Sequence, residues 1–202
     1  MKKYFYRLLS GACAGLSAAA FAAPAGAVPW TVQIKNSAGQ PLANAVVAVE
    51  VRGRPAKTTT ARAEMAQRDR QFAPQVLVIQ TGTSVSFPNF DTVRHHVYSF
   101  SPIKVFETKL YSGTPSEPIV FDKPGIAALG CNIHDRMSAH IVVVDTALFA
   151  KTDASGMAYF ADLPSGEQPM KIWFSGMKTP TFLSQTLNVG ASTGLTAVSL
   201  SE

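Results

Sequence analysis

The sequence predicts an all-β protein, and three features of its pattern support this prediction. Short runs of β-branched and aromatic residues recur along the chain, separated by turn-forming Gly, Pro, Asn and Asp. Residues 83–87 alternate between polar and apolar side chains, the period of two typical of a half-buried strand. Only residues 60–70 have a composition that suits a helix, and we expect them to form a loop or a short helix.

The expected strands follow one another from residue 30 onward. The first two, residues 30–34 and 45–51, flank a turn at residues 36–41 that contains Asn, Gly and Pro. Two further turn-rich segments, residues 152–156 and 163–166, precede the last strand. Examples of further expected strands are residues 76–80, 85–87, 97–100, 119–121, 126–129, 140–144 and 170–174.

The first residues are typical of an export signal. Lys2, Lys3 and Arg7 precede an apolar run at residues 8–21, and small residues suit cleavage after residue 22 or after residue 27. The apolar run is shorter than the roughly 20 residues that span a bilayer, and no later run reaches that length. We therefore expect a signal peptide at residues 1–22 and a soluble periplasmic protein without a membrane span.

The basic character of the chain comes mainly from this signal. It holds three of the 18 basic residues and none of the 13 acidic ones, so the remainder has 15 basic and 13 acidic residues, a net charge of +2. No run of Lys or Arg remains, which argues against nucleic acid as a partner. About 175 residues are left, enough for one large domain or two small ones.

Outside the signal peptide the chain has a single cysteine, Cys131. The other, Cys13, would be removed with the signal, and it does not suit lipid attachment because Ser10 stands where such sites carry a bulky aliphatic residue. A lone cysteine is unusual in an oxidising compartment, where structural thiols pair. The count alone leaves two alternatives, a metal ligand and an inert buried thiol.

Cys131 begins a Cys-x-x-His-x-x-Met motif that continues with His134 and Met137. A second imidazole comes from His95 or His96, and only one of these faces the metal because side chains alternate along a strand. A thiolate, two imidazoles and a weak thioether are the ligands of a blue-copper electron-transfer site. Taken singly, His134 suits a solvated residue and Met137 a core residue. Their order and spacing together favour copper.

Four ordered segments resemble the cupredoxins, the blue-copper family. They are residues 72–74 (Phe-Ala-Pro), 82–89 (Gly-Thr-Ser-Val-Ser-Phe-Pro-Asn), 95–97 (His-His-Val) and the Cys131 loop. The resemblance covers residues 64–145, and the short loop is closer to amicyanin and pseudoazurin than to plastocyanin. Plastocyanin-like proteins often labelled methylamine utilization proteins are similar as well. The resemblance implies a Greek-key β-sandwich that binds one type 1 copper ion per chain and carries single electrons.

The resemblance also implies roles for individual residues. In cupredoxins the first residue of such a histidine pair is the ligand, which favours His95 over His96. The implied copper ligands are His95, Cys131, His134 and Met137. The second histidine would point away and hydrogen-bond to the residue after the cysteine. Residues outside the ligand set that are expected to orient it are His96, Asn89 and Asn132.

One position departs from the family pattern. Relatives with this loop often carry a tryptophan where Arg136 stands. Together with Arg94, Arg136 would add positive charge to the apolar surface around His134, through which electrons pass in cupredoxins. This implies an acidic partner surface and a salt-dependent association rate. Alternatively, Arg136 pairs with Asp135 or faces water. The expected partner is a periplasmic redox protein, either a dehydrogenase or a c-type cytochrome.

The remaining polar residues do not indicate catalysis. Asp91 is typical of a turn and Asp135 flanks a ligand, so the two are not expected to form an acid–base pair. His140 lies too far along the chain to join the loop ligands, and we expect a surface or structural role for it. Four histidines are too few for the trinuclear centre of a multicopper oxidase. We therefore expect a non-enzyme.

The flanking segments resemble a second small domain. Residues 32–47 resemble the opening hairpin of carboxypeptidase regulatory-like domains, which are transthyretin-like sandwiches, and that pattern continues only at residues 152–174. We therefore expect a discontinuous sandwich of residues 28–56 and 146–202, with a cupredoxin domain at residues 57–145 inserted into a surface loop. The alternatives are one enlarged sandwich and two domains in series.

Three functions remain open at this point. The first is a periplasmic electron shuttle. The second is copper storage or delivery. Methionine- or histidine-rich tails would favour it, and the mature termini have neither. The third is a structural β-module that keeps the motif without a metal.

Overall fold

The computed structural model describes residues 26–51, 58–115 and 117–200. These residues form 17 β-strands and no helix, which confirms the all-β prediction. The described residues therefore contain no helix long and apolar enough to cross a membrane. The predicted signal peptide, residues 1–22, lies outside the described residues, and so do residues 52–57, where the first two predicted domain segments meet.

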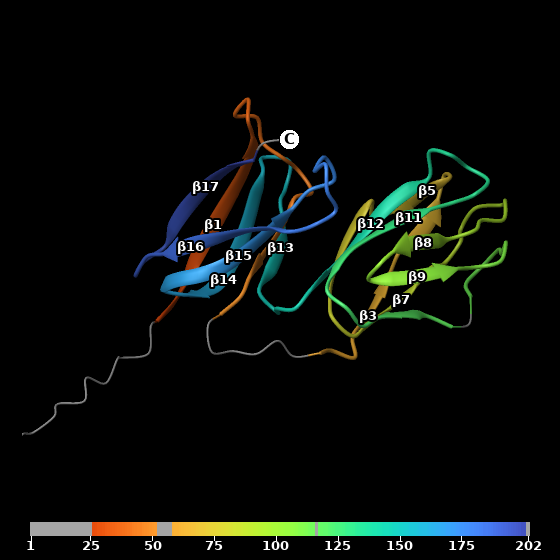
Figure 1. Cartoon of the computed structure of the whole chain (residues 1–202), viewed down its shortest axis with the longest axis horizontal. Coiled ribbons are helices and arrows are strands. Elements are labelled where there is room, and N and C mark those ends of the chain that lie inside the picture. The colour runs from red at the N-terminus through yellow and green to blue at the C-terminus, as the bar shows by residue number, and fades with distance from the viewer. Residues whose placement is uncertain (1–25, 52–57, 116, 201–202) are drawn as a thin grey trace, which may run out of the picture.

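Strands from two distant parts of the chain form one β-sandwich, here called the terminal sandwich (Figure 1). Apolar side chains from its two sheets share a core that includes Val32, Ile34, Val47, Ile172 and Leu187. One sheet has the strand order β14 (Met157–Pro164), β1 (Ala27–Asn36), β17 (Gly194–Leu200). The other has the order β13 (Phe149–Lys151), β2 (Val46–Val49), β15 (Gly166–Trp173), β16 (Leu183–Val189).

Strands between residues 62 and 144 form a second layered unit, here called the central sandwich (Figure 1). Its five-stranded sheet has the order β6 (Val76–Gln80), β12 (Ser138–Val144), β11 (Gly125–Gly130), β8 (Tyr98–Ser101), β9 (Lys104–Glu107). Its three-stranded sheet has the order β10 (Ile119–Phe121), β7 (Thr83–Ser86), β3 (Arg62–Glu64). A hairpin of β4 (Ala66–Arg68) and β5 (Gln71–Ala73) completes it. Its core includes Val85, Val97, Phe121, Leu129 and Ile141.

Residues 60–70, expected as a loop or a short helix, form the strands β3 and β4 instead. Burial decides this outcome, because Met65 and Gln67 have no exposed surface and a pairing partner is available in β7. Asp69 and Arg70 then adopt positive φ angles of 51° and 58°, which turn the chain into β5. The helix-favouring composition is therefore overridden by tertiary packing.

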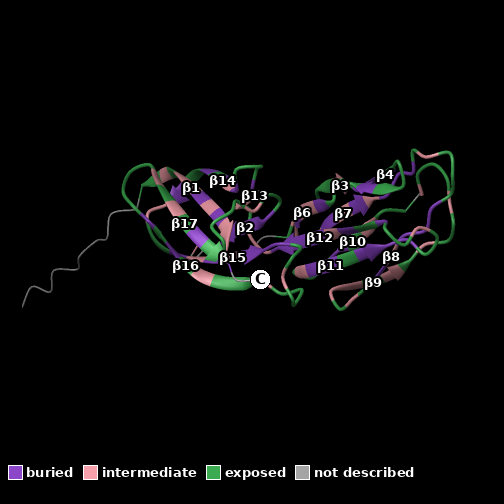
Figure 2. Cartoon of the chain, turned by 90° about the horizontal axis from the view of Figure 1, so that it is seen from above, coloured by how far each residue is buried: buried purple, intermediate pink, exposed green. Residues whose placement is uncertain are grey.

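A third apolar cluster joins the two sandwiches. Val46, Ala48 and Trp173 of the terminal sandwich pack against Val76, Ile126, Val142 and Val144 of the five-stranded sheet. These four residues lie on the face of that sheet that points away from the core of the central sandwich, and we call it the outer face. Figure 2 shows buried residues continuing from β15 to β12, where the two sandwiches meet. The outer face is thus covered along part of its width.

The strands of the two sandwiches come from different parts of the chain. Residues 27–49 and 149–200 supply the strands of the terminal sandwich, and residues 62–144 supply those of the central one. Whether the two units are separate domains, with boundaries at residues 56 and 145, stays a prediction.

Candidate metal centre

The Cys131 loop is short because two paired strands hold both of its ends. Gly130, the last residue of β11, lies opposite Ser138, the first residue of β12, in an antiparallel ladder. Inside the loop the amide of Met137 donates to the carbonyl oxygen of His134 at 2.9 Å, which closes a tight turn. The loop therefore presents its cysteine, histidine and methionine from one small, clamped segment.

His95 reaches the same place from a neighbouring segment. Its backbone exchanges two hydrogen bonds of 2.9 Å with Tyr111 just before β8 begins. Its side chain has no exposed surface. The Nδ1 atom lies 4.0 Å from the Sγ atom of Cys131, and Nδ1 of His134 lies 3.9 Å from the same sulfur.

These three ligand atoms all lie within 4.8 Å of one another, so His95, Cys131 and His134 could hold one metal ion. Sulfur and nitrogen atoms that share a tetrahedral or trigonal ion at ordinary bond lengths lie about 3.5–3.8 Å apart. The observed spacing is close to that. Met137 is 1% exposed and belongs to the same apolar cluster as Cys131, whose own exposure is 4%. His134 is half-buried and lies nearer the surface.

Asp91 holds the other side of the His95 ring. Its Oδ2 atom lies 2.7 Å from Nε2 of His95, and its carboxylate also accepts the backbone amides of Asp69 and Arg70 at 2.7 and 2.9 Å. Burial opposes ionisation of Asp91, but the hydrogen bonds from Arg70, His95 and Asp69 outweigh it and lower the pKa of this carboxyl. With the proton of His95 drawn to Nε2, its Nδ1 lone pair faces Cys131 as a metal ligand requires.

The turn that contains Asp91 is fixed by Asn89, whose role in orienting the ligands stays a prediction. The side-chain amide nitrogen of Asn89 donates to the carbonyl oxygens of Val93 and Tyr111 at 2.8 and 3.1 Å. Its side-chain oxygen accepts the backbone amide of Asp91 at 2.9 Å. All three bonds shape the segment that delivers His95.

Half-buried Tyr111 and buried Gln67 form a polar pair next to this turn. The Tyr111 hydroxyl donates to the carbonyl oxygen of Phe87 at 2.6 Å, and the amide of Gln67 donates both to that carbonyl and to the hydroxyl. Burial raises the pKa of Tyr111 to about 12; the Gln67 bond lowers it, and the charge of Cys131 raises it further. Tyr111 therefore stays neutral and serves as a hydrogen-bonded support for the backbone beside His95.

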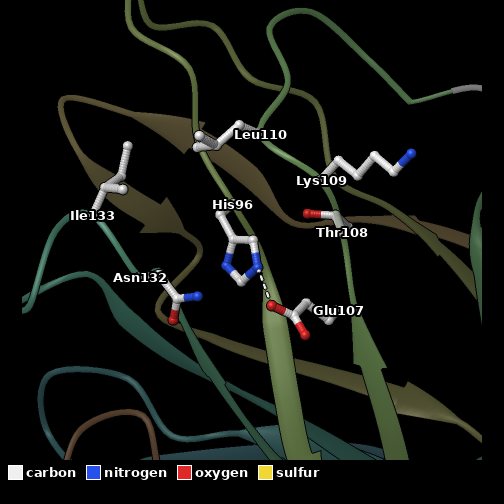
Figure 3. Close-up of a pocket in the computed structure, with 7 residues that line it drawn as sticks. All are labelled: His96, Glu107, Thr108, Lys109, Leu110, Asn132 and Ile133. Carbon is white, nitrogen blue, oxygen red and sulfur yellow. Dashed lines mark hydrogen bonds and ion pairs between the residues drawn. The ribbon is translucent and has the colours of Figure 1, made fainter.

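His96 points to the opposite side of the strand from His95, and its partner differs from the expected one. Nε2 of His96 lies 2.9 Å from the Glu107 carboxylate, while Nδ1 is buried and has no hydrogen-bond partner. Figure 3 shows the side chain of Asn132 beside the unpaired nitrogen. The expected bond between His96 and Asn132 is therefore not formed. Both residues line a pocket of about 560 Å³ together with Glu107, Lys109 and Ile133.

The other predicted positions are placed as follows. Arg94 and Arg136 are exposed, as are Asn132 and Asp135. His140 is half-buried, with its ring 4.9 Å from that of Trp173. Sequence reasoning missed the contacts of Asp91, Glu107, Gln67 and Tyr111 with the histidines and their supporting backbone. Of these four residues, only Asp91 had a usable signal in the sequence, because it lies four residues before His95 in an Asn-x-Asp turn.

Comparison with known proteins gives structural neighbours only. No protein-family model and no curated protein matches the chain. A purple cupredoxin from Nitrosopumilus maritimus is 21% identical, covering 42% of this chain and 99% of its own, with a TM-score of 0.36. A copper-containing nitrite reductase from Thermus scotoductus is 26% identical, covering 48% of this chain and 25% of its own, with a TM-score of 0.39.

A reduced Cu(I) amicyanin variant is 14% identical, covering 48% of this chain and 98% of its own, with a TM-score of 0.38. The chain thus spans nearly the whole of the cupredoxin and of the amicyanin, and a quarter of the nitrite reductase. These neighbours are cupredoxins or cupredoxin-containing proteins, the family that the sequence resembles.

Proposed function

We propose that the central sandwich binds one type 1 copper ion and carries single electrons between redox proteins. One observation carries this proposal. Nδ1 of His95, Sγ of Cys131 and Nδ1 of His134 converge within 4.8 Å, although His95 lies 36 residues from the cysteine. Met137 is buried in the same apolar cluster and would supply the weak fourth ligand.

The donor set fits copper in both oxidation states. When bound, copper supplies the one-electron couple between Cu(II) and Cu(I). The thiolate of Cys131 is a soft ligand that suits Cu(I), while the imidazoles of His95 and His134 also suit Cu(II). Asp91 fixes the ring of His95, and the paired ends of β11 and β12 fix the loop. Ligands that stay in place during a change of valence keep the barrier to electron transfer low.

The burial of the site favours electron transfer over copper delivery. His95, Cys131 and Met137 are 0%, 4% and 1% exposed, so a partner protein cannot reach these ligands without displacing the loop. Delivery would need the opposite, a site that opens easily. A carrier needs only a ligand edge near the surface, and half-buried His134 supplies it. With Met137 as the fourth donor, a bound copper ion would have its ligands supplied by the chain and none by a substrate, so we infer a non-enzyme.

The proposed setting follows from the sequence. A signal peptide at residues 1–22 would export the chain to the periplasm, where dehydrogenases and c-type cytochromes are the expected class of partner. Exposed Arg94 and Arg136 support an acidic docking surface on that partner. We further propose that the terminal sandwich is a transthyretin-like domain into which the copper domain is inserted.

The test is a visible spectrum of the mature chain after addition of Cu(II). We expect an intense blue colour that a reductant bleaches and an oxidant restores. Cys131→Ser should bind copper without the blue colour, while Ser138→Ala, at the far end of the same loop, should keep it. A colourless copper complex of the unchanged chain would favour delivery, and no copper binding at all would favour the structural module.

A further inference from the structure

The carboxylate of Asp91 is held in one position from two sides. On one side its Oδ2 atom lies 2.7 Å from Nε2 of His95. On the other side Oδ1 accepts the backbone amide of Asp69 at 2.7 Å, and Oδ2 accepts that of Arg70 at 2.9 Å. With N–H donors on both sides, the carboxylate acts only as an acceptor, as its ionised form does. A negative charge is therefore fixed directly behind His95.

The turn between β4 and β5 is shaped to hold this carboxylate. Asp69 and Arg70 have φ angles of 51° and 58°, a left-handed conformation that costs residues other than glycine free energy. In this conformation their successive N–H groups both point at Asp91. Successive backbone amides in a turn form a small binding site for an anion, and here the anion is a side chain of the same chain. The turn thus keeps the charge in place.

Water screens this charge only weakly. The side chain of Asp91 is 15% exposed, and that of His95 has no exposed surface. The carboxylate contacts Nε2 of the ring, while Nδ1, on the other side of the ring, lies 4.0 Å from Sγ of Cys131. One buried imidazole therefore separates the carboxylate from the position of the metal. Charges that are largely buried interact more strongly than charges in water.

The second ligand imidazole lacks such a partner. Among the residues that the structure describes, no carboxylate lies within hydrogen-bonding distance of His134. Asp135, its neighbour in the chain, is exposed to solvent. The negative charge therefore acts on the site from one side only, through His95.

We propose that Asp91 is a positioning residue that acts through His95 to favour Cu(II) over Cu(I), and so lowers the reduction potential of the site. This inference rests on the proposed copper function. Cu(II) carries one more positive charge than Cu(I), so a fixed negative charge behind a ligand stabilises it more. A hydrogen bond to a carboxylate also makes an imidazole a more basic ligand. The two effects have the same sign.

This bias makes the reduced protein a stronger electron donor. The partner centre gains the one electron that the oxidation of Cu(I) to Cu(II) releases. No proton moves, because the hydrogen bond to Asp91 keeps its proton on Nε2 of His95 in both oxidation states. The bias therefore favours delivery of the electron to the partner over its retention.

The test compares the affinities of the full mature chain for Cu(II) and Cu(I), together with its reduction potential. Asp91→Asn removes the charge but keeps the shape of the side chain and an oxygen that can accept the backbone amides. We expect Cu(II) binding to weaken about tenfold more than Cu(I) binding. A tenfold change in this ratio raises the reduction potential by about 59 mV.

The matched control is Asp135→Asn, which removes the same charge from an exposed position next to the ligand His134. Both the ratio of affinities and the potential should stay unchanged in this variant, since water and salt screen an exposed charge. An equal rise of the potential in the two variants would show that only net charge matters. Equal losses of Cu(I) and Cu(II) affinity in Asp91→Asn would show that the carboxylate only orients the ring. Either result overturns the inference.

A second measurement needs neither a variant nor copper. In the copper-free, unchanged chain, NMR of the ring nitrogens should find the proton of His95 on Nε2, in a slowly exchanging hydrogen bond. A proton on Nδ1 would also overturn the inference. A chain that never turns blue with copper contradicts the proposed function and this inference with it. A blue chain whose potential is the same in Asp91→Asn contradicts this inference alone.

Discussion

At the scale of single residues, the carboxylate of Asp91 links the buried His95 ring to the turn between β4 and β5. Asp91→Ala removes the hydrogen bond at Nε2 and leaves two backbone amides without their acceptor. We expect copper affinity to fall about 10–100-fold, since partners that orient a ligating histidine typically contribute that much. A competition titration against a copper chelator measures it.

The matched control is Asp69→Asn, which alters a neighbouring carboxylate whose residue contributes only its backbone amide to this network. Copper affinity should be unchanged in this variant. If Asp91→Ala also binds copper like the unchanged chain, the carboxylate does not orient His95 and its short contact has no role in the site.

At the scale of elements, the sequence predicts strands whose positions are set by local alternation and turn residues. It does not predict the contacts between strands. Alternation and turn residues located β6, β7, β11 and β12, and the ligand motif was readable because three of its members lie within seven residues. The strands β3 and β4 were missed because burial of Met65 and Gln67 overrides their composition. The pairing of His96 with Glu107 depends on the β8–β9 register, which no local pattern specifies.

The β8–β11 contact yields a prediction at the same scale. Gly130→Ala places a methyl group within 2.4 Å of the Tyr98 ring, so the ring or the strand must move. We expect the free energy of unfolding to fall by about 1–3 kcal/mol, the usual cost of overpacking. Chemical denaturation measures it, and Gly190→Ala is the control because the nearest atoms to its Cβ position lie at an ordinary contact distance of 3.4 Å. Equal stability of the two variants would contradict the packing described for Tyr98.

At the scale of the whole molecule, His140 lies where the two sandwiches meet, against Trp173. Burial lowers the pKa of His140, because the charged ring would lose its hydration there. The folded protein therefore binds this proton less readily than the unfolded chain does. The resulting stability is fully present above the unfolded pKa of about 6.5 and is lost as the pH falls below it.

We therefore expect His140→Gln to reduce the pH dependence of folding. Denaturant unfolding at about pH 7.5 and about pH 5.5 brackets the titration of a free histidine. The unchanged chain should lose more stability between the two values than the variant does. Because the two proteins differ only at position 140, the difference between the two losses isolates that residue. Identical losses would show that the His140 ring stays hydrated at the junction.

X-ray absorption of the copper-loaded protein, recorded in both oxidation states, tests the metal centre most directly. The account predicts one short copper–sulfur bond and two copper–nitrogen bonds in Cu(II), with nearly the same distances after reduction to Cu(I). A first coordination shell of nitrogen and oxygen alone, or one that rearranges when the copper is reduced, would contradict it.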